Sequence, residues 1–211
     1  FAGTETTLEQ RNWVANATIL DGRGDTTLHV VSCAATVPAL DGFTIRSGGR
    51  GVSVTAGSVA VANCTMSGNA WGVHVTGSTA TVTNCTVRSN TRGIYVYTGG
   101  TATVTRCVVE TNTAIAIYVS GGSATVSNSL LRACNSGVTT VSGAANVANS
   151  TICGNVTGAY INGGSGVFTN CIVGYNTTGI QRLSPSTPLT LSHNDVFGNT
   201  SANYTGVTNP T

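Results

Sequence analysis

The chain has 211 residues, of which 40% are hydrophobic and only 8% are charged, and its formal net charge is +2. This hydrophobic content is enough for one sizeable core, whereas the sparse basic residues, all of them arginine, do not form a surface for nucleic acid. No stretch approaches about eighteen consecutive apolar residues, so we expect no segment that inserts into a membrane.

Residues 1–16 are polar and carry no repeat, so we expect a short amino-terminal segment or partial cap. An internal repeat occupies residues 17–199. Its anchor positions follow one another at intervals of 21–23 residues, and they are Phe43, Cys64, Cys85, Cys107, Ser129, Ser150, Cys171 and Asn194. A fixed period of this length is typical of a solenoid, in which each coil packs on the next.

Two columns of asparagine share this period. The first column immediately precedes the anchors and contains Asn63, Asn84, Asn128, Asn149 and Asn170. The second column stands five residues after them and contains Asn69, Asn90, Asn112, Asn155 and Asn176. Asparagine tolerates the left-handed backbone of a sharp bend, and its side-chain amide can bond to the same amide in neighbouring coils. We therefore predict that both columns are internal ladders at the corners of the coils.

Apolar and polar residues alternate within each repeat, as they do in a half-buried β-strand. Before Asn84, for example, Ala80 and Val82 alternate with Thr79 and Thr81. No repeat shows the roughly 3.6-residue period of a helix. The sequence therefore predicts an all-β, single-domain parallel β-helix of about nine coils over residues 17–199, followed by an irregular tail at residues 200–211.

The anchor column is expected to lie inside the rod, because a small apolar thiol fits beside a tight bend. Serine takes the place of cysteine in two of the coils, and the cysteines of the column are Cys64, Cys85, Cys107 and Cys171. No two cysteines have the short spacing of a metal-binding pair, so we predict no metal site and no cofactor. Outside the column, Cys153 falls on an outward position.

The pattern Asn-x-x-Gly-[Ile/Val]-x-[Val/Ile] recurs, with small variations, at residues 69–75, 90–96 and 155–161. Together with the early segments ATILDGRGD and ALDGFTIRSG, it resembles the right-handed parallel β-helix proteins of the pectin-lyase-like superfamily. The resemblance covers residues 17–199 and implies a right-handed solenoid. It leaves the function open, since this fold carries lyases, hydrolases, adhesins, ice-binding proteins and inert scaffolds.

The resemblance also implies what an active site would need. Lyases of the superfamily hold calcium with clustered acidic side chains and use an arginine or lysine as base, and the related hydrolases use two or three aspartates on one face. The seven carboxylates here are Glu5, Glu9, Asp21, Asp25, Asp41, Glu110 and Asp195.

No two of these carboxylates are expected on adjacent coils of one outward face beside a basic partner. The best candidate is the pair Asp21 and Asp41 with Arg23, but Asp-Gly is the sequence of ordinary turns. The three histidines fall on separate coils, and no nucleophile elbow accompanies them. We therefore expect no catalytic residues and no enzyme activity.

Three outward columns are candidates for a surface function. The first is a stripe of rings that would stack on sugar rings, and with one residue inserted near Ala114 it contains His74, Tyr95, Tyr118, Thr139, Tyr160 and Gln181. The second is an alternating charge column, most simply a surface ion network, that contains Arg88, Glu110 and Arg132. The third is an array of hydroxyl groups that resembles an ice-binding face and contains Thr79, Thr81, Thr83, Thr101, Thr103, Thr105, Ser123, Thr125 and Ser127.

The asparagines of the columns occur in several glycosylation sequons, but a buried ladder asparagine cannot carry a glycan. We therefore expect glycosylation only at Asn16 and Asn203. Neither end of the repeat carries an amphipathic helix that would cover an open strand edge. This predicts head-to-tail association, in which residues 194–199 of one subunit meet residues 19–24 of the next.

These features favour a non-catalytic structural β-solenoid located outside the cell or on its surface, as a filament subunit, a stalk or an adhesin-like scaffold. The alternative is a carbohydrate-binding or degenerate polysaccharide-processing module, and the third interpretation is an ice-binding protein. The expected partners are a second copy of the chain, joined head to tail, and a polysaccharide.

Overall fold

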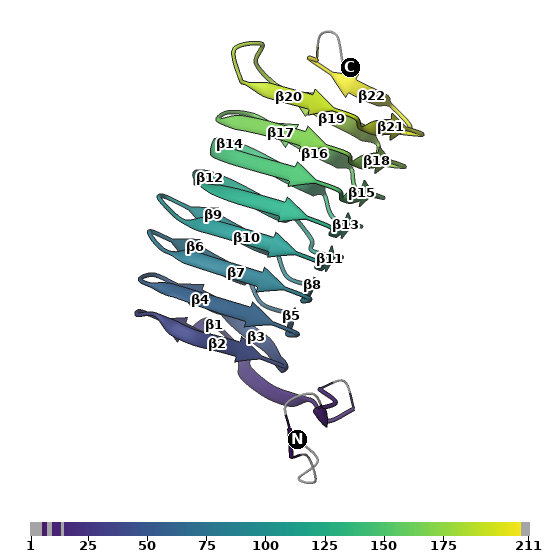
Figure 1. The fold of residues 1–211 in the computed structure, drawn as a ribbon. Helices are drawn as coiled ribbons and strands as arrows, with labels where there is room; N and C mark the ends of the chain where they lie inside the picture. The colour runs from purple at the N-terminus through teal and green to yellow at the C-terminus, as the bar shows by residue number, and fades with distance from the viewer. Residues whose placement is uncertain (1–5, 8–9, 14, 208–211) are drawn as a thin grey trace.

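The protein is a rod of stacked coils. The structure is a computed structural model that describes residues 6–7, 10–13 and 15–207. Its regular elements are β-strands that pair in parallel with the equivalent strands of neighbouring coils, and the coils rise from the amino to the carboxyl end (Figure 1). In this part of the chain no helix is long and apolar enough to cross a membrane. The predicted all-β solenoid is confirmed.

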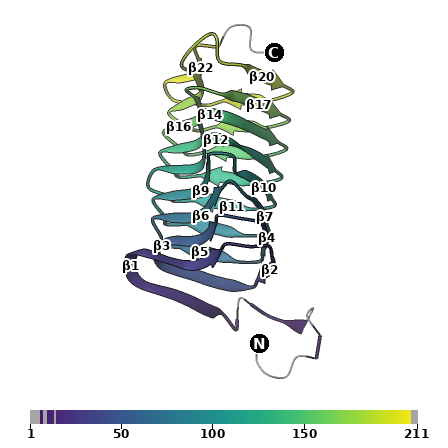
Figure 2. The same ribbon diagram turned by 90° about the vertical axis from the view of Figure 1, so that its left-hand side faces the viewer.

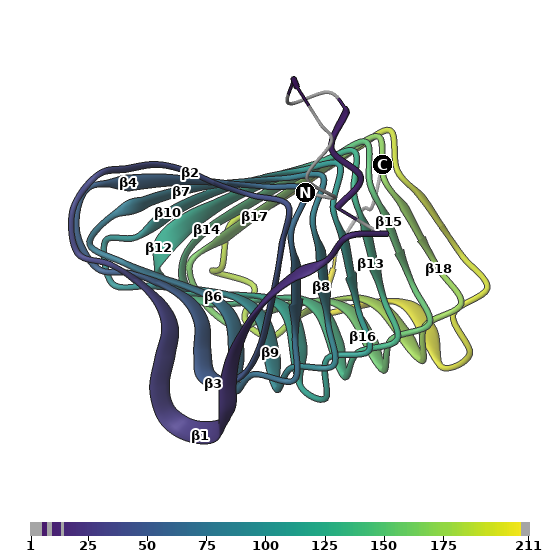
Figure 3. The same ribbon diagram turned by 90° about the horizontal axis from the view of Figure 1, so that it is seen from below.

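Each coil has three sides, which are visible when the rod is viewed along its axis (Figure 3). We call the first side the threonine face. It is built from β2 (Val37–Asp41), β4 (Ser58–Ala62), β7 (Thr79–Thr83), β10 (Thr101–Thr105), the second halves of β12 (Ile115–Ser127) and β14 (Ser136–Ala148), β17 (Ser165–Thr169) and β20 (Leu189–Ser192).

The other two sides are the short-strand face and the aromatic face. The short-strand face contains the first parts of β1 (Thr18–Cys33) and β3 (Phe43–Val54), then β5 (Thr65–Ser67), β8 (Thr86–Arg88), β11 (Val108–Glu110), β13 (Leu130–Arg132), β15 (Thr151–Cys153), β18 (Ile172–Gly174) and β21 (Asp195–Phe197). The aromatic face contains the last parts of β1 and β3, β6 (Trp71–Thr76), β9 (Arg92–Tyr97), the first halves of β12 and β14, β16 (Thr157–Ile161), β19 (Thr178–Arg182) and β22 (Ala202–Thr205).

The core lies between the three faces and is formed by stacked aliphatic side chains. Ala80 and Val82 of β7 are fully buried, whereas Thr79 and Thr81 of the same strand are exposed. The same residue types repeat in register one coil higher, at residues 101–105. The alternation in the sequence therefore gives the inward and outward sides of these strands correctly.

The described residues form nine coils, because nine strands follow one another on the short-strand face. The first coil is longer than the predicted 21–23 residues, since Thr18 pairs with Phe43 and the register of β1 shifts between Asp21 and His29. There β1 projects beyond the coils above it (Figure 3).

The two ends differ in part from the prediction. Arg11 pairs with Asp41, and the Trp13 side chain lies against Gly42, so this part of residues 1–16 lies on the first coil (Figure 2). At the other end β22 pairs with β19, so the prediction of an irregular tail from residue 200 is wrong for residues 202–205. Residues 1–5, 8–9, 14 and 208–211 lie outside the described part. Head-to-tail association stays a prediction.

The first asparagine column forms the bends between the threonine face and the short-strand face. All of its asparagines have left-handed backbone, with φ between 50° and 54°. The prediction that this column is internal is wrong, because Asn63 is only half-buried and the others are exposed, namely Asn84, Asn128, Asn149 and Asn170. The left-handed bend requires a tolerant residue, but its side chain points to solvent.

The second asparagine column is a buried ladder inside the next corner. The backbone N–H of Asn69 donates to Oδ1 of Asn90 over 2.9 Å, and the backbone N–H of Asn90 donates to Oδ1 of Asn112 over 3.0 Å. The Asn90 side chain also donates to the carbonyl oxygens of Met66 and Arg88. Cys134 interrupts the ladder, and it resumes with members that are equally buried, namely Asn155 and Asn176.

The cysteines and serines of the anchor column are buried as well, and members of this column accept backbone hydrogen bonds from the coil below. The N–H of Cys64 donates to Sγ of Cys85 over 3.5 Å, and the N–H of Cys107 donates to Oγ of Ser129 over 3.1 Å. Serine replaces cysteine here because both supply a small side chain with an acceptor. The chain's seven cysteines are free, and all are buried except Cys153, which is half-buried.

Candidate functional site

The predicted stripe of rings lies in a single column of the aromatic face. Strand pairing puts these residues next to one another on successive coils, in the order His74, Tyr95, Tyr118, Thr139, Tyr160 and Gln181. A second column runs beside it and contains Arg50, Trp71 and Arg92. The residue spacing alone did not predict this second column.

A local irregularity explains why the second column was missed. In β6 both Gly72 and Val73 are buried, so strict alternation fails between Trp71 and His74, and both of these side chains belong to the aromatic face. A Cβ atom on Gly72 would lie 2.7 Å from the carbonyl oxygen of Gly93 and 2.6 Å from a methyl carbon of Val87. The glycine before the aliphatic residue, replaced by alanine only at Ala116, is the sequence signal for this irregularity.

The two columns meet in a compact group that we call the aromatic cluster: Arg50, Trp71, His74, Arg92, Tyr95 and Tyr118. The Trp71 and His74 rings are stacked with centroids 5.0 Å apart, and the Tyr95 ring lies 5.4 Å from His74 and 5.0 Å from Tyr118. The Arg50 guanidinium lies 4.6 Å from the centroid of the Trp71 ring.

Arg92 occupies the same kind of position one coil above Trp71. Its guanidinium lies 5.5 Å from the Tyr95 centroid and 5.3 Å from the Tyr118 centroid. Guanidinium groups over aromatic faces are held by cation–π attraction. The cluster therefore presents two guanidinium groups that lie over aromatic rings.

Two buried nitrogen atoms of the cluster have no hydrogen-bond partner among the described residues. They are Nδ1 of His74, a residue that is only 4% exposed, and Nε of Arg92. Buried polar atoms are paired in the great majority of cases. Two of the three unpaired buried side-chain atoms among the described residues therefore belong to the aromatic cluster.

The charge of the cluster comes from its arginines. Burial, together with the positive charges of Arg50 and His29, lowers the pKa of His74 to about 4. His74 is therefore neutral near pH 7. Burial also lowers the pKa of Arg50, but the usual pKa of arginine is so high that this guanidinium stays charged.

Because the pKa of His74 is lowered in the folded state, the free energy of unfolding should depend on pH. Since the unfolded histidine takes up a proton below its usual pKa of 6.5 and the folded one only near 4, the free energy of unfolding should fall as the pH drops through this interval. The expected loss is about 3 kcal/mol at most. Urea unfolding at pH 7 and pH 4 checks this, and in the variant His74→Gln the loss should shrink. An equal acid loss in both proteins would contradict the assignment.

Hollows adjoin the cluster along the same face. One, of about 190 Å³, is lined by residues that include His29, Arg50 and Trp71. Another, of about 390 Å³, lies farther toward the carboxyl end and is lined by residues that include Thr139 and Tyr160. Tyr160 therefore lies in the predicted stripe but next to a separate hollow, away from the ring contacts of the cluster.

The acidic residues are placed elsewhere. Asp21 accepts a hydrogen bond from Nε of Arg46 over 2.9 Å and another from the backbone N–H of Arg23, and the pKa of Asp21 is lowered by these two contacts. Asp41 pairs with Arg11 and lies in a different column. The structure thus separates the predicted acidic pair. Among the described residues no three potential metal ligands come together.

The other predicted surface features have the following positions. Arg132 pairs with Glu110 over 2.6 Å, and Arg88 lies in the same column. The hydroxyl array is in register on β7, β10 and β12. Of the two predicted glycosylation sites, Asn16 is half-buried and Asn203 is exposed, and Oδ1 of Asn203 accepts a hydrogen bond from Nδ2 of Asn199 over 2.9 Å. The exclusion of Asn84 and Asn149 as buried is wrong, because both are exposed.

Comparison with known proteins agrees with this architecture. Residues 71–209 match the model of a family described as a right handed beta helix region. No curated protein matches the chain. Because the family match covers well over half of the sequence and the described coils form one continuous parallel solenoid, the chain belongs to the right-handed β-helix family.

Proposed function

We propose that the protein is a carbohydrate-binding β-solenoid that holds an acidic polysaccharide on its aromatic face. The observation that carries this proposal is the aromatic cluster, in which two guanidinium groups lie over aromatic rings beside two unpaired buried nitrogens. This arrangement favours the carbohydrate-binding alternative over the purely structural and ice-binding interpretations of the sequence.

The chemistry of the cluster suits a sugar that carries a negative charge. The apolar face of a pyranose ring packs on an aromatic ring such as that of Trp71, while a carboxylate or sulfate pairs with a guanidinium in a two-pronged geometry. The Arg92 guanidinium lies over the Tyr95 and Tyr118 rings, where it can pair with such an anion. The rings and the cations therefore recognise different parts of one acidic sugar.

We assign no catalytic step to this site. Asp21 pairs with Arg46, Asp41 with Arg11 and Glu110 with Arg132, and none of these carboxylates belongs to the aromatic cluster. The role is that of a rigid scaffold that presents a binding surface. We place it outside the cell or on its surface, where polysaccharides occur. Burial of the thiols, Cys153 being half-buried, would protect them from the oxidants found there.

Calorimetric titration with an oligogalacturonate hexamer and with a heparin hexasaccharide tests the proposal. Replacement Trp71→Ala should weaken the binding of whichever acidic sugar is recognised by about tenfold or more, because the stacking ring is lost. The matched control is Trp13→Ala, since Trp13 is the chain's other tryptophan and lies at the amino-terminal end. Absence of binding to both sugars, or equal affinity in the two variants, would reject the proposal.

A further inference from the structure

A second column of left-handed residues lies at the corner between the short-strand face and the aromatic face. Its φ angles are between 52° and 66°, and its members are Ser47, Gly68, Ser89, Thr111, Ala133, Gly154, Tyr175 and Gly198. All are small except Tyr175, whose φ is 58°. A bulky residue is rare in this conformation and is strained there, so the position is one that favours glycine or a small polar residue.

The Tyr175 ring is held in place on the surface. It meets the Phe197 ring edge to face, with centroids 5.3 Å apart and an interplanar angle of 78°. It also lies over Gly198, where a Cβ atom would be 3.3 Å from the ring, and the Phe197 ring lies in the same way against Gly174. Each ring thus packs on a glycine of the neighbouring coil.

This ring pair is open to solvent. Tyr175 is 69% exposed and Phe197 is 36% exposed, although both are large apolar side chains. A strained and exposed ring contributes little to the core, so its position is better explained by what it presents to solvent.

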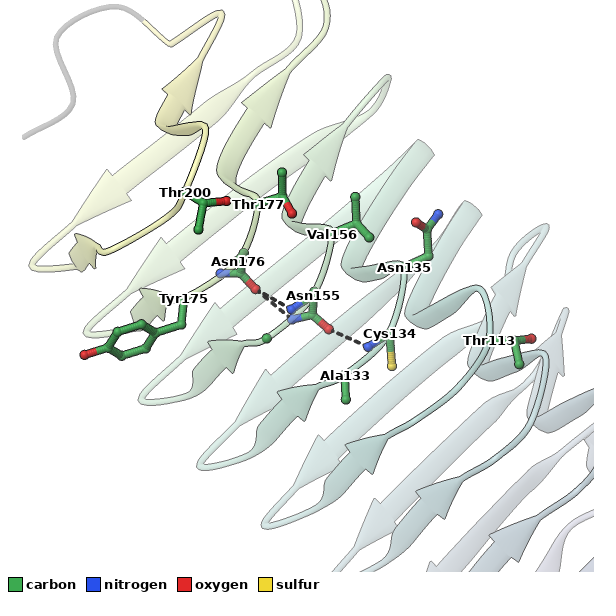
Figure 4. Close-up of a pocket in the computed structure, with 11 residues that line it drawn as sticks. Thr113, Ala133, Cys134, Asn135, Asn155, Val156, Tyr175, Asn176, Thr177 and Thr200 are labelled. Atoms are coloured by element: carbon green, nitrogen blue, oxygen red, sulfur yellow. Dashed lines mark hydrogen bonds between the residues drawn. The ribbon is translucent and has the colours of Figure 1, made fainter.

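A groove of about 670 Å³ begins beside Tyr175 and crosses successive coils toward Thr113. Figure 4 shows Tyr175 on one side of the buried Asn176, and Thr177 and Thr200 on the other side. The far wall continues through Val156 and Asn135 in the coils below. The groove therefore runs along the rod and offers a polar group in most coils, at a spacing of about 4.8 Å.

The lining of the groove contains no charged side chain among the described residues. In this it differs from the aromatic cluster, which carries two arginines. Hydroxyl and amide groups beside an exposed tyrosine are the groups that recognise an uncharged sugar, through hydrogen bonds to its hydroxyls and packing on its apolar face.

We propose that this groove is a second binding site, for an uncharged glycan chain that lies along the rod with one sugar ring on Tyr175. The site is distinct from the aromatic cluster and does not depend on the function proposed above. The Tyr175 ring lies against Gly198 at the edge of the groove, next to the left-handed bend.

The variant Tyr175→Gly separates binding from stability, because glycine occurs at the equivalent positions Gly154 and Gly198. Calorimetric titration with cellohexaose, xylohexaose and mannohexaose should detect binding of at least one of these sugars to the unmodified chain. The variant should bind that sugar about tenfold more weakly, as expected for loss of a stacking ring. Its melting temperature should stay the same or rise, since the strain is removed. Added salt should leave the affinity unchanged, because no charge is involved.

The matched control is Trp71→Ala, which should leave neutral-sugar binding intact while it weakens acidic-sugar binding. The inference is overturned if none of the three neutral hexasaccharides binds, or if Tyr175→Gly binds as well as the unmodified chain. It is also overturned if the variant melts lower and Tyr175 proves to be a packing residue, or if sedimentation shows that Tyr175 mediates self-association. Each of these outcomes leaves the acidic-sugar proposal untouched.

Discussion

Replacement of Asn90 by leucine is expected to lower the free energy of unfolding by roughly 2–6 kcal/mol. The side chain accepts from the backbone N–H of Asn69 and donates to the carbonyl oxygen of Met66, and both of these groups are inside the rod. Leucine has a similar volume but cannot pair with them, and each unpaired buried group costs about 1–3 kcal/mol. Urea unfolding followed by circular dichroism gives the difference directly.

The matched control lies in the exposed asparagine column. Asn84→Gly keeps a residue that accepts the left-handed backbone at φ 53° and removes a solvent-exposed side chain, whose hydrogen bonds with Arg106 and Asn63 are exposed as well. We expect its stability to change by less than about 0.5 kcal/mol. If both variants unfold at the same urea concentration as the unmodified chain, the ladder does not support the fold in the way described here.

The double variant Arg50→Gln and Arg92→Gln is expected to lose about 100-fold or more in affinity for an acidic hexasaccharide, because two charge-assisted hydrogen bonds are worth about 1.5–3 kcal/mol each. Glutamine keeps a polar side chain but lacks the charge and the forked guanidinium donors. In the unmodified chain the affinity should also fall as salt is added, and this dependence should weaken in the double variant.

Arg88→Gln is the control for this experiment. Arg88 is exposed on the short-strand face, in a different column from Arg50 and Arg92, so its replacement should change neither the affinity nor the salt dependence. If the Arg88 variant loses as much affinity as the double variant, binding depends on overall charge, and the aromatic cluster is not the site.

The period of the sequence fixes most of this architecture. Because strand partners are separated by one repeat, the column of His74, Tyr95 and Tyr118 could be aligned from residue spacing alone, including the inserted residue near Ala114. Alternation of apolar and polar residues within β7 correctly predicted which of its side chains are buried. Both are local rules that each coil repeats.

The features that the sequence did not reveal depend on the shape of the corners. Asparagine at a bend indicates left-handed backbone, but it does not determine whether the side chain turns inward, as that of Asn90 does, or outward, as that of Asn84 does. Trp71 and Arg92 were missed because the glycine that follows each of them interrupts the alternation. The exposure of Tyr175 depends on two glycines, Gly174 and Gly198, that lie on different coils.

The most direct test of the central claim is nuclear magnetic resonance of the labelled protein during titration with the acidic hexasaccharide. The account predicts that the Nε–H signal of Arg92 and the indole N–H signal of Trp71 shift together, because the anion pairs with the Arg92 guanidinium and the sugar ring packs on Trp71. The indole signal of Trp13 and the Nε–H signal of Arg132, which already pairs with Glu110, should stay in place. Binding that leaves the Arg92 and Trp71 signals unchanged while it shifts signals on another face would contradict the account.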